Sequence, residues 1–210
     1  MANAMIVKRV HQHIADKIKA DLPIRARINV GNNTYQLGGT QFLSETRIID
    51  DGGIDTLDAS MAKAGVALDL TPGHLSSVGV TATGVGAVNN LSLGLGSLIE
   101  NAIGSDFDDV ILGNDLANVL SGGKGNDWID GGKGIDTAAF EGSRSDYLIS
   151  TGFGKTFVTG RDGIRGFDTL LGIEIIKFAD QSITLGSSAY GADMNISVDQ
   201  DSSVAGFLPD

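Results

Sequence analysis

Residues 104–139 read GSDFDDVIL, GNDLANVLS, GGKGNDWID and GGKGIDTAA when the chain is divided every nine residues. Across these four units, position one is glycine, position six is aspartate or asparagine, and position eight is apolar. The position-six residues are Asp109, Asn118, Asp127 and Asp136, and the position-eight residues are Ile111, Leu120, Ile129 and Ala138. Three columns in phase indicate a repeat architecture, whereas a glycine-rich surface loop with scattered aspartates does not account for them.

The spacing predicts how each unit folds. Its first six residues are rich in glycine, which tolerates positive φ and favours a tight turn. Its last three residues predict a short strand in which only the position-eight side chain points inward. Two units then complete one turn of a flattened right-handed coil, with loops alternating between its two edges. The sequence therefore predicts an all-β protein built on a parallel β-roll.

Stacked loops of this kind predict metal sites. Backbone carbonyls and a position-six side chain from each loop would face one gap between loops two repeats apart. This donor set suits calcium, which accepts about six to eight oxygen ligands in irregular geometry. Residues 104–139 contain seven Asp against two Lys, so the stacked carboxylates would repel one another without a cation. The metal is therefore expected to be part of the fold.

The second unit departs most from the repeat, because Leu116 stands where the pattern favours a glycine that eases the turn, and Asn118 replaces an aspartate. Two carboxylates are expected to meet at the Asp109/Asp127 pair, and one carboxylate and one amide at the Asn118/Asp136 pair. Ligand charge is a main determinant of calcium affinity. The first pair is therefore expected to bind calcium more tightly.

The length fits one domain, or one domain with a small appendage, and the composition suits a protein that collects cations. The 210 residues carry a net charge of −11, and residues 1–30 hold six Lys or Arg against Asp16 and Asp21, so the remainder carries −15. An acidic body argues against nucleic-acid binding, which needs a basic face. The chain has no cysteine and hence no disulfides. No apolar run is long enough to span a membrane, and no secretory signal peptide is visible.

The N-terminal segment predicts a helix. Apolar residues recur every four positions from Val10 to Ile18, which is typical of an amphipathic helix, here over residues 1–23 and ended by a proline. His11 and His13 are interpreted as solvated histidines on its polar face. The helix is expected to cover an open end of the roll.

Residues 24–103 predict short strands separated by turns. The stretch Asp50–Leu57 repeats the loop chemistry, with paired glycines, an aspartate two residues later and then an apolar residue. It is interpreted as an outlying calcium loop. Glu100 stands nine residues before Asp109 and so occupies the position-six column one repeat early. It is expected on the edge that the Asn118 loop uses.

The nine-residue period ends after Ala139. Residues 140–185 predict antiparallel strands with hairpin spacing, which would cap the coil and cover its last open edge. Residues 186–210 are polar, small and acidic, and they are interpreted as a poorly ordered tail.

From Asn29 to Ala139 the chain resembles the C-terminal domain of the serralysin metalloproteases, which carry the hemolysin-type repeats of RTX proteins. The matching pieces, in order, are NVGNNTYQL, DGGIDTLDAS, LDLTPGHLSSVG and LIENAIG, which runs directly into the nonapeptides. The block from FEGSRSDYLIS to DTLLGIEIIKFADQSITL is similar to the capping segment found after the repeats in many secreted RTX proteins.

The resemblance implies a module that binds several calcium ions and folds on them outside the bacterial cell, after export by the type I secretion machinery. It implies calcium ligands among the loop carbonyls and position-six side chains of the repeats. In this chain these residues are Ser105, Phe107, Asp109, Asn118, Gly122, Gly123, Gly125, Asp127, Gly131, Gly132, Gly134 and Asp136. The implied ligands upstream are Asp50, Gly52, Gly53, Asp55, the Leu98 carbonyl and Glu100, and a further loop with Asn29, Gly31 and Asn33.

The sequence lacks the catalytic motifs of related secreted enzymes. None of its three histidines lies in the H-E-x-x-H-x-x-G-x-x-H pattern of a serralysin, and it has no G-x-S-x-G nucleophile elbow. We therefore expect a non-catalytic calcium-binding module that serves secretion and folding. The alternatives are a C-terminal fragment of a secreted metalloprotease or other RTX exoenzyme, an adhesive or matrix protein, and a polysaccharide-modifying module like those of alginate epimerases.

Overall fold

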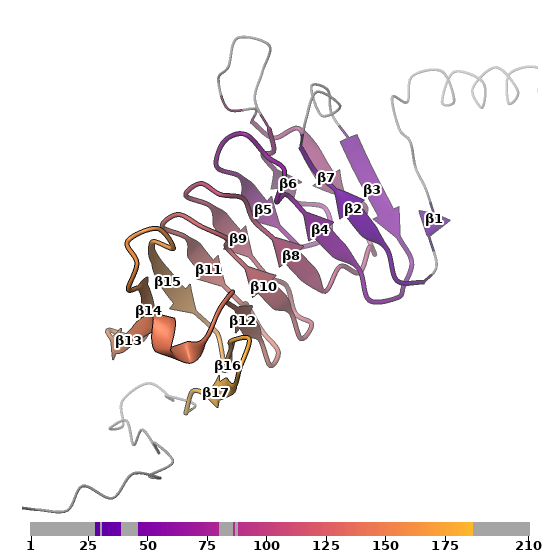
Figure 1. The fold of residues 1–210 in the computed structure, drawn as a ribbon. Coiled ribbons are helices and arrows are strands. Elements are labelled where there is room, and N and C mark those ends of the chain that lie inside the picture. Colours follow the sequence, from indigo (N-terminus) through magenta and orange to yellow (C-terminus); the bar gives the residue numbers. More distant parts are fainter. Residues whose placement is uncertain (1–27, 30, 39–45, 80–85, 87, 187–210) are drawn as a thin grey trace, which may run out of the picture.

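The structure is a computed structural model. It describes residues 28–29, 31–38, 46–79, 86 and 88–186. These residues form an elongated stack of short strands (Figure 1), and the one helical element among them is the 3-10 turn η2 at Arg144–Asp146. Within the described residues, no helix is long and apolar enough to cross a membrane. The helix predicted over residues 1–23, including His11 and His13, lies outside them, as does the tail from residue 187 onward.

Two long sheets make up the body of the stack, and both consist largely of parallel pairs. The seven-stranded sheet contains, in spatial order, β17 (Ser182–Thr184), β16 (Ile175–Lys177), β12 (Thr137–Ala139), β10 (Val119–Ser121), β8 (Asn101–Ile103), β4 (Thr56–Asp58) and β2 (Thr34–Gln36). The six-stranded sheet contains β13 (Tyr147–Gly152), β14 (Lys155–Gly160), β15 (Phe167–Leu171), β11 (Trp128–Asp130), β9 (Val110–Leu112) and β5 (Ala67–Asp69).

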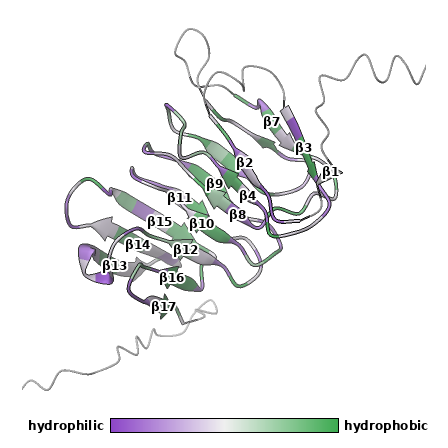
Figure 2. Ribbon diagram, turned by 45° about the vertical axis from the view of Figure 1, so that its right-hand side comes forward, coloured by the Kyte–Doolittle hydropathy of each residue, from purple (hydrophilic) through white to green (hydrophobic). Residues whose placement is uncertain are grey.

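The core is two columns of middle-strand residues, one from each sheet. In the seven-stranded sheet Leu120 pairs with Ala102 and with Ala138, and in the six-stranded sheet Ile129 pairs with Ile111. These five side chains are at most 1% exposed. Figure 2 shows hydrophobic residues concentrated on the stacked strands, while many loop residues are hydrophilic. The predicted inward column of the nonapeptides is therefore confirmed, and with it the parallel β-roll.

The coil extends beyond the four nonapeptides in both directions. Upstream, Leu57 pairs with Ala102 and Leu68 pairs with Ile111, so β4 and β5 continue the two sheets. The loop at Asp50–Leu57 was expected to be an outlying one, but it belongs to the same stack as the repeats. The upstream strands lack the glycine period, yet they pair in register because their middle residues are also apolar.

The segment after Ala139 is antiparallel only in part. β13 and β14 form an antiparallel hairpin, and β17 runs antiparallel to β16. β15 and β16, however, pair in parallel with β11 and β12. Each of these two strands also has an antiparallel neighbour, β14 beside β15 and β17 beside β16. The expectation of an antiparallel cap is therefore wrong only for the parallel pairs with β11 and β12, through which β15 and β16 add a further turn to the coil.

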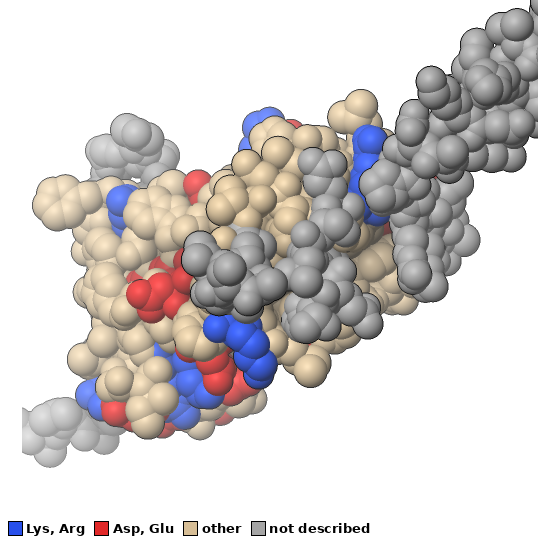
Figure 3. Space-filling model, turned by 90° about the horizontal axis from the view of Figure 1, so that it is seen from above, with Lys and Arg blue, Asp and Glu red and all other residues tan. Residues whose placement is uncertain are grey.

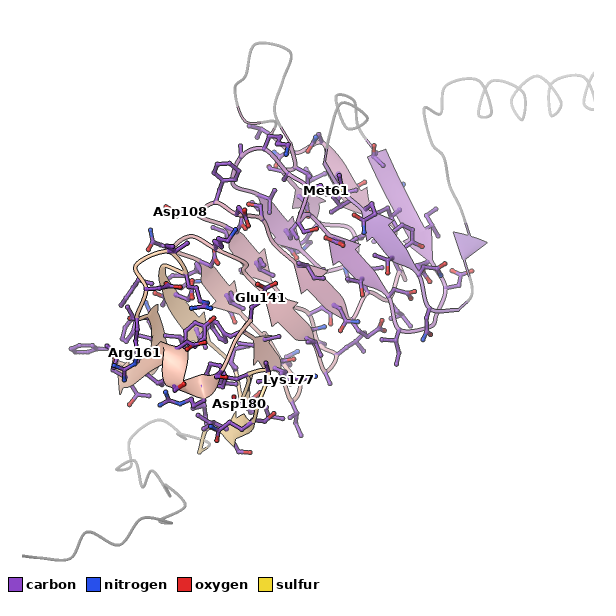
Figure 4. All side chains as sticks on the ribbon, viewed as in Figure 1. Met61, Asp108, Glu141, Arg161, Lys177 and Asp180 are labelled. Atoms are coloured by element: carbon purple, nitrogen blue, oxygen red, sulfur yellow. The ribbon has the colours of Figure 1, made fainter. Side chains whose placement is uncertain are left out.

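An aromatic cluster closes this end of the coil. The ring centroid of Tyr147 lies 5.3 Å from that of Phe140 and 5.2 Å from that of Phe178. The Tyr147 hydroxyl donates a hydrogen bond of 2.5 Å to the Glu141 carbonyl oxygen. The labelled side chains of Arg161, Lys177 and Asp180 lie at the same end (Figure 4). The cluster covers apolar surface that the last turn would otherwise expose.

A smaller sheet lies at the other end of the stack. Its strands are, in spatial order, β1 (Ile28–Asn29), β3 (Thr46–Asp50), β7 (Leu91–Leu93) and β6 (Leu75–Ser76). β3 leads directly into the loop 51–55, and β7 leads into the loop 94–100. This sheet therefore positions two of the loops described below.

Candidate metal sites

The loops of the coil stack on two edges, which we call the first edge and the second edge. The first edge is formed by the loops 59–66, 104–109 and 122–127 and by the segment 161–168. The second edge is formed by the loops 31–33, 51–55, 94–100, 113–118, 131–136 and 172–174. Asp108, labelled in Figure 4, lies on the first edge. Loops two repeats apart thus stack on the same edge, as the nonapeptide spacing predicts.

Position-six side chains connect successive loops of the first edge. The backbone N–H of Asp109 donates a hydrogen bond of 2.9 Å to Oδ1 of Asp127. The N–H of Asp127 donates one of 2.9 Å to Oδ1 of Asp168, and the N–H of Val66 donates one of 2.6 Å to Oδ1 of Asp109. Each carboxylate therefore reaches back to the preceding loop and occupies the gap between the two.

The second edge has the same construction. The N–H of Asn118 donates to Oδ1 of Asp136 at 2.7 Å, and the N–H of Asp136 donates to Oε2 of Glu174 at 2.8 Å. Upstream, the N–H of Asp55 donates to Oε2 of Glu100 at 2.8 Å. Glu100 therefore lies on the edge that also carries Asn118.

The remaining upstream candidates also gather on the second edge. The N–H of Asn33 donates to Oδ1 of Asp55 at 2.7 Å, and the N–H of Gly31 donates to the Gly52 carbonyl at 2.7 Å. Asp50 is fully buried, and its carboxylate accepts hydrogen bonds from the Tyr35 hydroxyl and from the Gly52 N–H. Protein donors thus engage both carboxylate oxygens of Asp50, whereas Oδ2 of Asp55 has no hydrogen-bond partner.

Gly53, Leu98 and Asn29 lie in the same region. Gly53 has a φ of +138°, and the Leu98 N–H donates to the Asp50 carbonyl at 3.3 Å. Asn29 pairs with Asp50 between β1 and β3.

Asp168 and Glu174 complete the two edges, and the sequence reasoning missed both. Asp168 begins the run Asp-Thr-Leu, which has the aspartate-any-apolar pattern of the repeats, and Glu174 begins the similar run Glu-Ile-Ile. That short pattern was the available signal. The nine-residue spacing could not find them, because Leu170 and Ile176, which extend the two core columns, are only six residues apart.

Among the described residues, three buried carboxylate oxygens have no hydrogen-bond partner. They are the Oδ2 atoms of Asp55, Asp127 and Asp136, and these residues are at most 3% exposed. A buried polar atom without a partner costs about 1–3 kcal/mol, and more when it is charged. An oxygen without a protein donor is free to accept a ligand, and a hard cation suits a carboxylate oxygen beside backbone carbonyls.

The pKa values of these carboxylates also indicate that their ionised forms are unfavourable in the buried loops. Burial raises the pKa of Asp136 to about 6, with the Glu174 charge adding to the effect. Burial also raises the pKa of Asp127, and the neighbouring Asp168 carboxylate raises it further. The pKa values of Asp55, Asp109 and Asp168 are raised as well, chiefly by burial. A bound cation would reverse this pattern, because its charge favours the ionised form.

The glycines at positions two and four bring carbonyl oxygens into these gaps. Gly123 has a φ of +105° and Gly125 one of +109°, and an added Cβ would collide with the Ser105 carbonyl or the Phe107 carbonyl, respectively. The loop 122–127 therefore lies directly against the carbonyls of the loop 104–109. The gap that holds the Asp127 carboxylate is thereby lined with oxygen atoms.

The loop 131–136 repeats this arrangement on the second edge. A Cβ on Gly132 would lie 2.6 Å from the Asn114 carbonyl oxygen, and one on Gly134 would collide with the Leu116 carbonyl. Gly122 and Gly131 begin their loops beside the carboxylates of their own position-six residues. A side chain at either position would fill the space next to the carboxylate.

Leu116 differs from its expected role. The sequence predicts a less favourable turn there, because a side chain replaces the glycine that eases the turn. Asn89 and Phe153 are the non-glycine residues with positive φ in the described part of the chain, so Leu116 is not left-handed. The loops 104–109 and 113–118 have a different local conformation, in which the position-two side chain bonds to the position-four N–H.

Side chains alone do not form these candidate sites. No group of three or more His, Asp or Glu side chains converges among the described residues. Any ion held here would be bound mostly by backbone carbonyls together with one carboxylate from each downstream loop. The exposed aspartates are distinct from these sites, since Asp106 pairs with Lys124 and Asp115 pairs with Lys133, each at 2.8 Å. On the face seen in Figure 3, acidic side chains likewise gather in patches, some beside basic ones.

Comparison with known proteins gives one family. Residues 44–207 of the 210 match the family model of the peptidase M10 serralysin C terminal. The matched model describes the non-catalytic C-terminal domain of these proteases. A search of curated proteins finds no match. The matched range includes all four nonapeptides, most of the upstream turns of the coil and the entire cap.

Proposed function

Because this chain belongs to the peptidase M10 serralysin C-terminal family, we propose that it is a non-catalytic calcium-binding module of a type I-secreted bacterial protein. In this proposal it folds on several calcium ions outside the cell. The observation that supports it best is the set of buried Oδ2 atoms of Asp55, Asp127 and Asp136, which lack protein partners and belong to loops in close contact with neighbouring backbone. Calcium supplies the positive charge that these gaps lack.

The residues that would hold the ions follow from the stacking. On the first edge, the Ser105 and Phe107 carbonyls face the loop that carries Asp127. On the second edge, the Asn114 and Leu116 carbonyls face the loop that carries Asp136. Upstream, the Gly31 carbonyl faces Gly53 in the loop that carries Asp55. The carboxylate of each downstream loop completes the donor set, and further gaps receive Asp168 and Glu174.

Coupling of binding to folding follows from the same geometry. Each turn of the coil buries one small or medium apolar side chain per strand, such as Ala138 or Ile129. Against this modest gain, each turn also buries carboxylates whose ionised form is disfavoured. A ligand that binds only the folded state stabilises it in proportion to the logarithm of its concentration. Calcium outside the cell would therefore fold a chain that is exported unfolded.

Attachment to a secreted protease is the second candidate. The family match favours it, because the family is defined by the C-terminal domain of metalloproteases. In that case the module would accompany a catalytic domain that carries the zinc-binding histidines. This candidate is tested by sequencing the DNA upstream of the gene and searching the same reading frame for a segment that encodes H-E-x-x-H.

Two experiments test the proposal itself. Isothermal titration of the calcium-free chain should show several calcium ions bound per chain, and fewer in the Asp127→Asn variant. Fusion of the chain to a reporter, expressed with a type I secretion apparatus, should place the reporter in the medium. A titration without binding would overturn the calcium role, and retention of the reporter in the cell would overturn the secretion role.

A further inference from the structure

One gap of the second edge is built differently from the rest. Between the loops 94–100 and 113–118, the position-six side chain is the carboxamide of Asn118 rather than a carboxylate. Position two of the downstream loop is Asn114, whereas the corresponding position is Gly132 in the loop 131–136. Both asparagines are buried, at 1% exposed for Asn118 and 8% for Asn114.

Every side-chain nitrogen and oxygen of the two carboxamides has a hydrogen-bond partner. Asn114 Nδ2 donates to the Ile99 carbonyl at 2.8 Å and to the Leu70 carbonyl at 3.1 Å. Asn118 Nδ2 donates to the Glu100 carbonyl at 3.0 Å and to Asn114 Oδ1 at 3.2 Å. Asn118 Oδ1 accepts from the Asn114 N–H at 2.8 Å, and Asn114 Oδ1 also accepts from the Leu116 N–H at 2.9 Å.

We propose that the carboxamides of Asn114 and Asn118 take the place of a calcium ion between the loops 94–100 and 113–118, so that this junction forms without metal. The inference rests on the proposed calcium role of the other gaps. The Ile99 and Glu100 carbonyl oxygens already receive N–H donors, and the positive ends of these donors occupy the position a cation would need. No carboxylate enters the gap from the downstream loop to offset a cation's charge.

The first edge shows the same relation at its first nonapeptide. Asp109 accepts hydrogen bonds from the Val66 N–H at 2.6 Å, the Ser105 N–H at 2.5 Å and the Ser105 hydroxyl at 2.9 Å. Both of its carboxylate oxygens have partners, whereas Oδ2 of Asp127 has none. Ser105 is again a polar side chain at position two. A polar side chain at position two forms hydrogen bonds with the position-six side chain of the same loop. Where position two is glycine, as at Gly123 and Gly132, one carboxylate oxygen has no such partner.

The consequence is a metal-independent connection between the upstream turns of the coil and the repeats. The gap on the upstream side of Ser105 lies between the loops 59–66 and 104–109, and the gap on the upstream side of Asn114 lies between the loops 94–100 and 113–118. Protein hydrogen bonds join the loops on either side of these two gaps. The gaps on the upstream side of Gly123 and of Gly132 depend on calcium instead. The side chain at position two therefore determines where in the stack calcium is required.

The test gives the loop 113–118 the same residues at positions two and six as the loop 131–136, namely glycine and aspartate. In the double variant Asn114→Gly/Asn118→Asp, the calcium stoichiometry measured by titration of the full chain should rise by one ion. The charge-matched control is Asn89→Asp, at an exposed residue away from both edges, and its stoichiometry should equal that of the wild type. Asn118→Ala should bind as many ions as the wild type. An unchanged stoichiometry in the double variant, or the loss of an ion in Asn118→Ala, would overturn the inference.

A measurement on the wild type keeps the inference testable if the double variant does not fold. In calcium-saturated protein, the Nδ2 protons of Asn114 and Asn118 should exchange with solvent much more slowly than those of exposed Asn89, as measured by NMR. Equal exchange rates would contradict the hydrogen bonds on which the inference depends. A wild-type chain that binds no calcium would overturn the proposed function instead.

Discussion

The backbone N–H of Asp109 donates a hydrogen bond of 2.9 Å to Oδ1 of Asp127, which lies eighteen residues later in the chain. The other oxygen of the same carboxylate, Oδ2, is buried without a partner. One oxygen therefore holds two turns of the coil together, and the other is available to a ligand. This division of roles recurs at Asp136 and Asp55.

Replacing Asp127 by asparagine should have opposite effects with and without calcium. The carboxamide would keep an oxygen that accepts the Asp109 N–H, but the negative charge would be lost. Calcium affinity at this gap should fall at least about 10-fold, or about 1.4 kcal/mol. Without calcium at pH 8 the variant should be at least as stable as the wild type, because the disfavoured buried charge is gone.

Thermal unfolding of the Asp127→Asn variant in calcium-free and calcium-containing buffer measures both effects. The control is Asp106→Asn, since Asp106 is exposed and pairs only with Lys124. That change should alter stability by less than about 0.5 kcal/mol in either buffer. Equal destabilisation of Asp127→Asn in the two buffers would show that the free oxygen has no metal role.

Stability should depend on pH in opposite directions with and without calcium. The Asp136 pKa rises from its ordinary 3.8 to about 6 in the folded chain, and burial also raises the pKa values of Asp127 and Asp168. Between the unfolded and folded pKa values the folded chain binds more protons. The stabilisation by these protonated groups is therefore present at low pH and is lost as pH rises through the folded pKa values.

The calcium-free chain should accordingly melt at a higher temperature at pH 5 than at pH 8. With saturating calcium the order should reverse, because ionised carboxylates bind the metal and protons compete with it. Melting temperatures in the four conditions test this prediction. A calcium-free chain whose stability increases from pH 5 to pH 8 would show that the buried carboxylates are not the controlling groups.

Magnesium should stabilise the fold much less than calcium. The candidate sites offer mostly backbone carbonyls in an irregular arrangement, whereas magnesium requires a compact octahedron and retains its water molecules. Melting temperatures at equal millimolar-range concentrations of the two ions provide the comparison, with sodium chloride at matched ionic strength as the control. Equal shifts for calcium and magnesium would point to general screening of negative charge.

Gly123→Ala should disrupt the first edge. Gly123 has a φ of +105°, and a Cβ there would collide with the Ser105 carbonyl oxygen. The strained backbone and the displaced carbonyl should together cost about 2 kcal/mol or more, and the chain should bind one calcium ion fewer. The matched control is Gly152→Ala, which has no atom within 4 Å of the added Cβ and no positive φ. A small effect at Gly123 would mean that the loops are not in close contact.

Much of this fold can be predicted from the sequence because the repeat is local. Three phased columns define the turn, the strand and the inward residue, and the pairing of Leu120 with Ala138 follows from them. The loop at Asp55 and the column position of Glu100 could also be recognised from short patterns.

The ends of the coil could not be predicted in the same way. Asp168 follows an inserted hairpin, and a short loop of three residues, 172–174, connects β15 to β16. Both features remove the nine-residue period while preserving parallel pairing. The direction of the Asn118 side chain was equally inaccessible, because it depends on hydrogen bonds to Glu100 and Asn114 across the stack.

The most direct test of the calcium-dependent roll is far-UV circular dichroism of the full chain during a calcium titration from metal-free buffer. The β-sheet signal and the melting temperature should increase as calcium reaches the millimolar range, and a chelator should reverse both changes. An identical spectrum and melting temperature with chelator and with calcium would contradict the calcium-dependent roll, because the buried oxygens of Asp55, Asp127 and Asp136 would then need no ion.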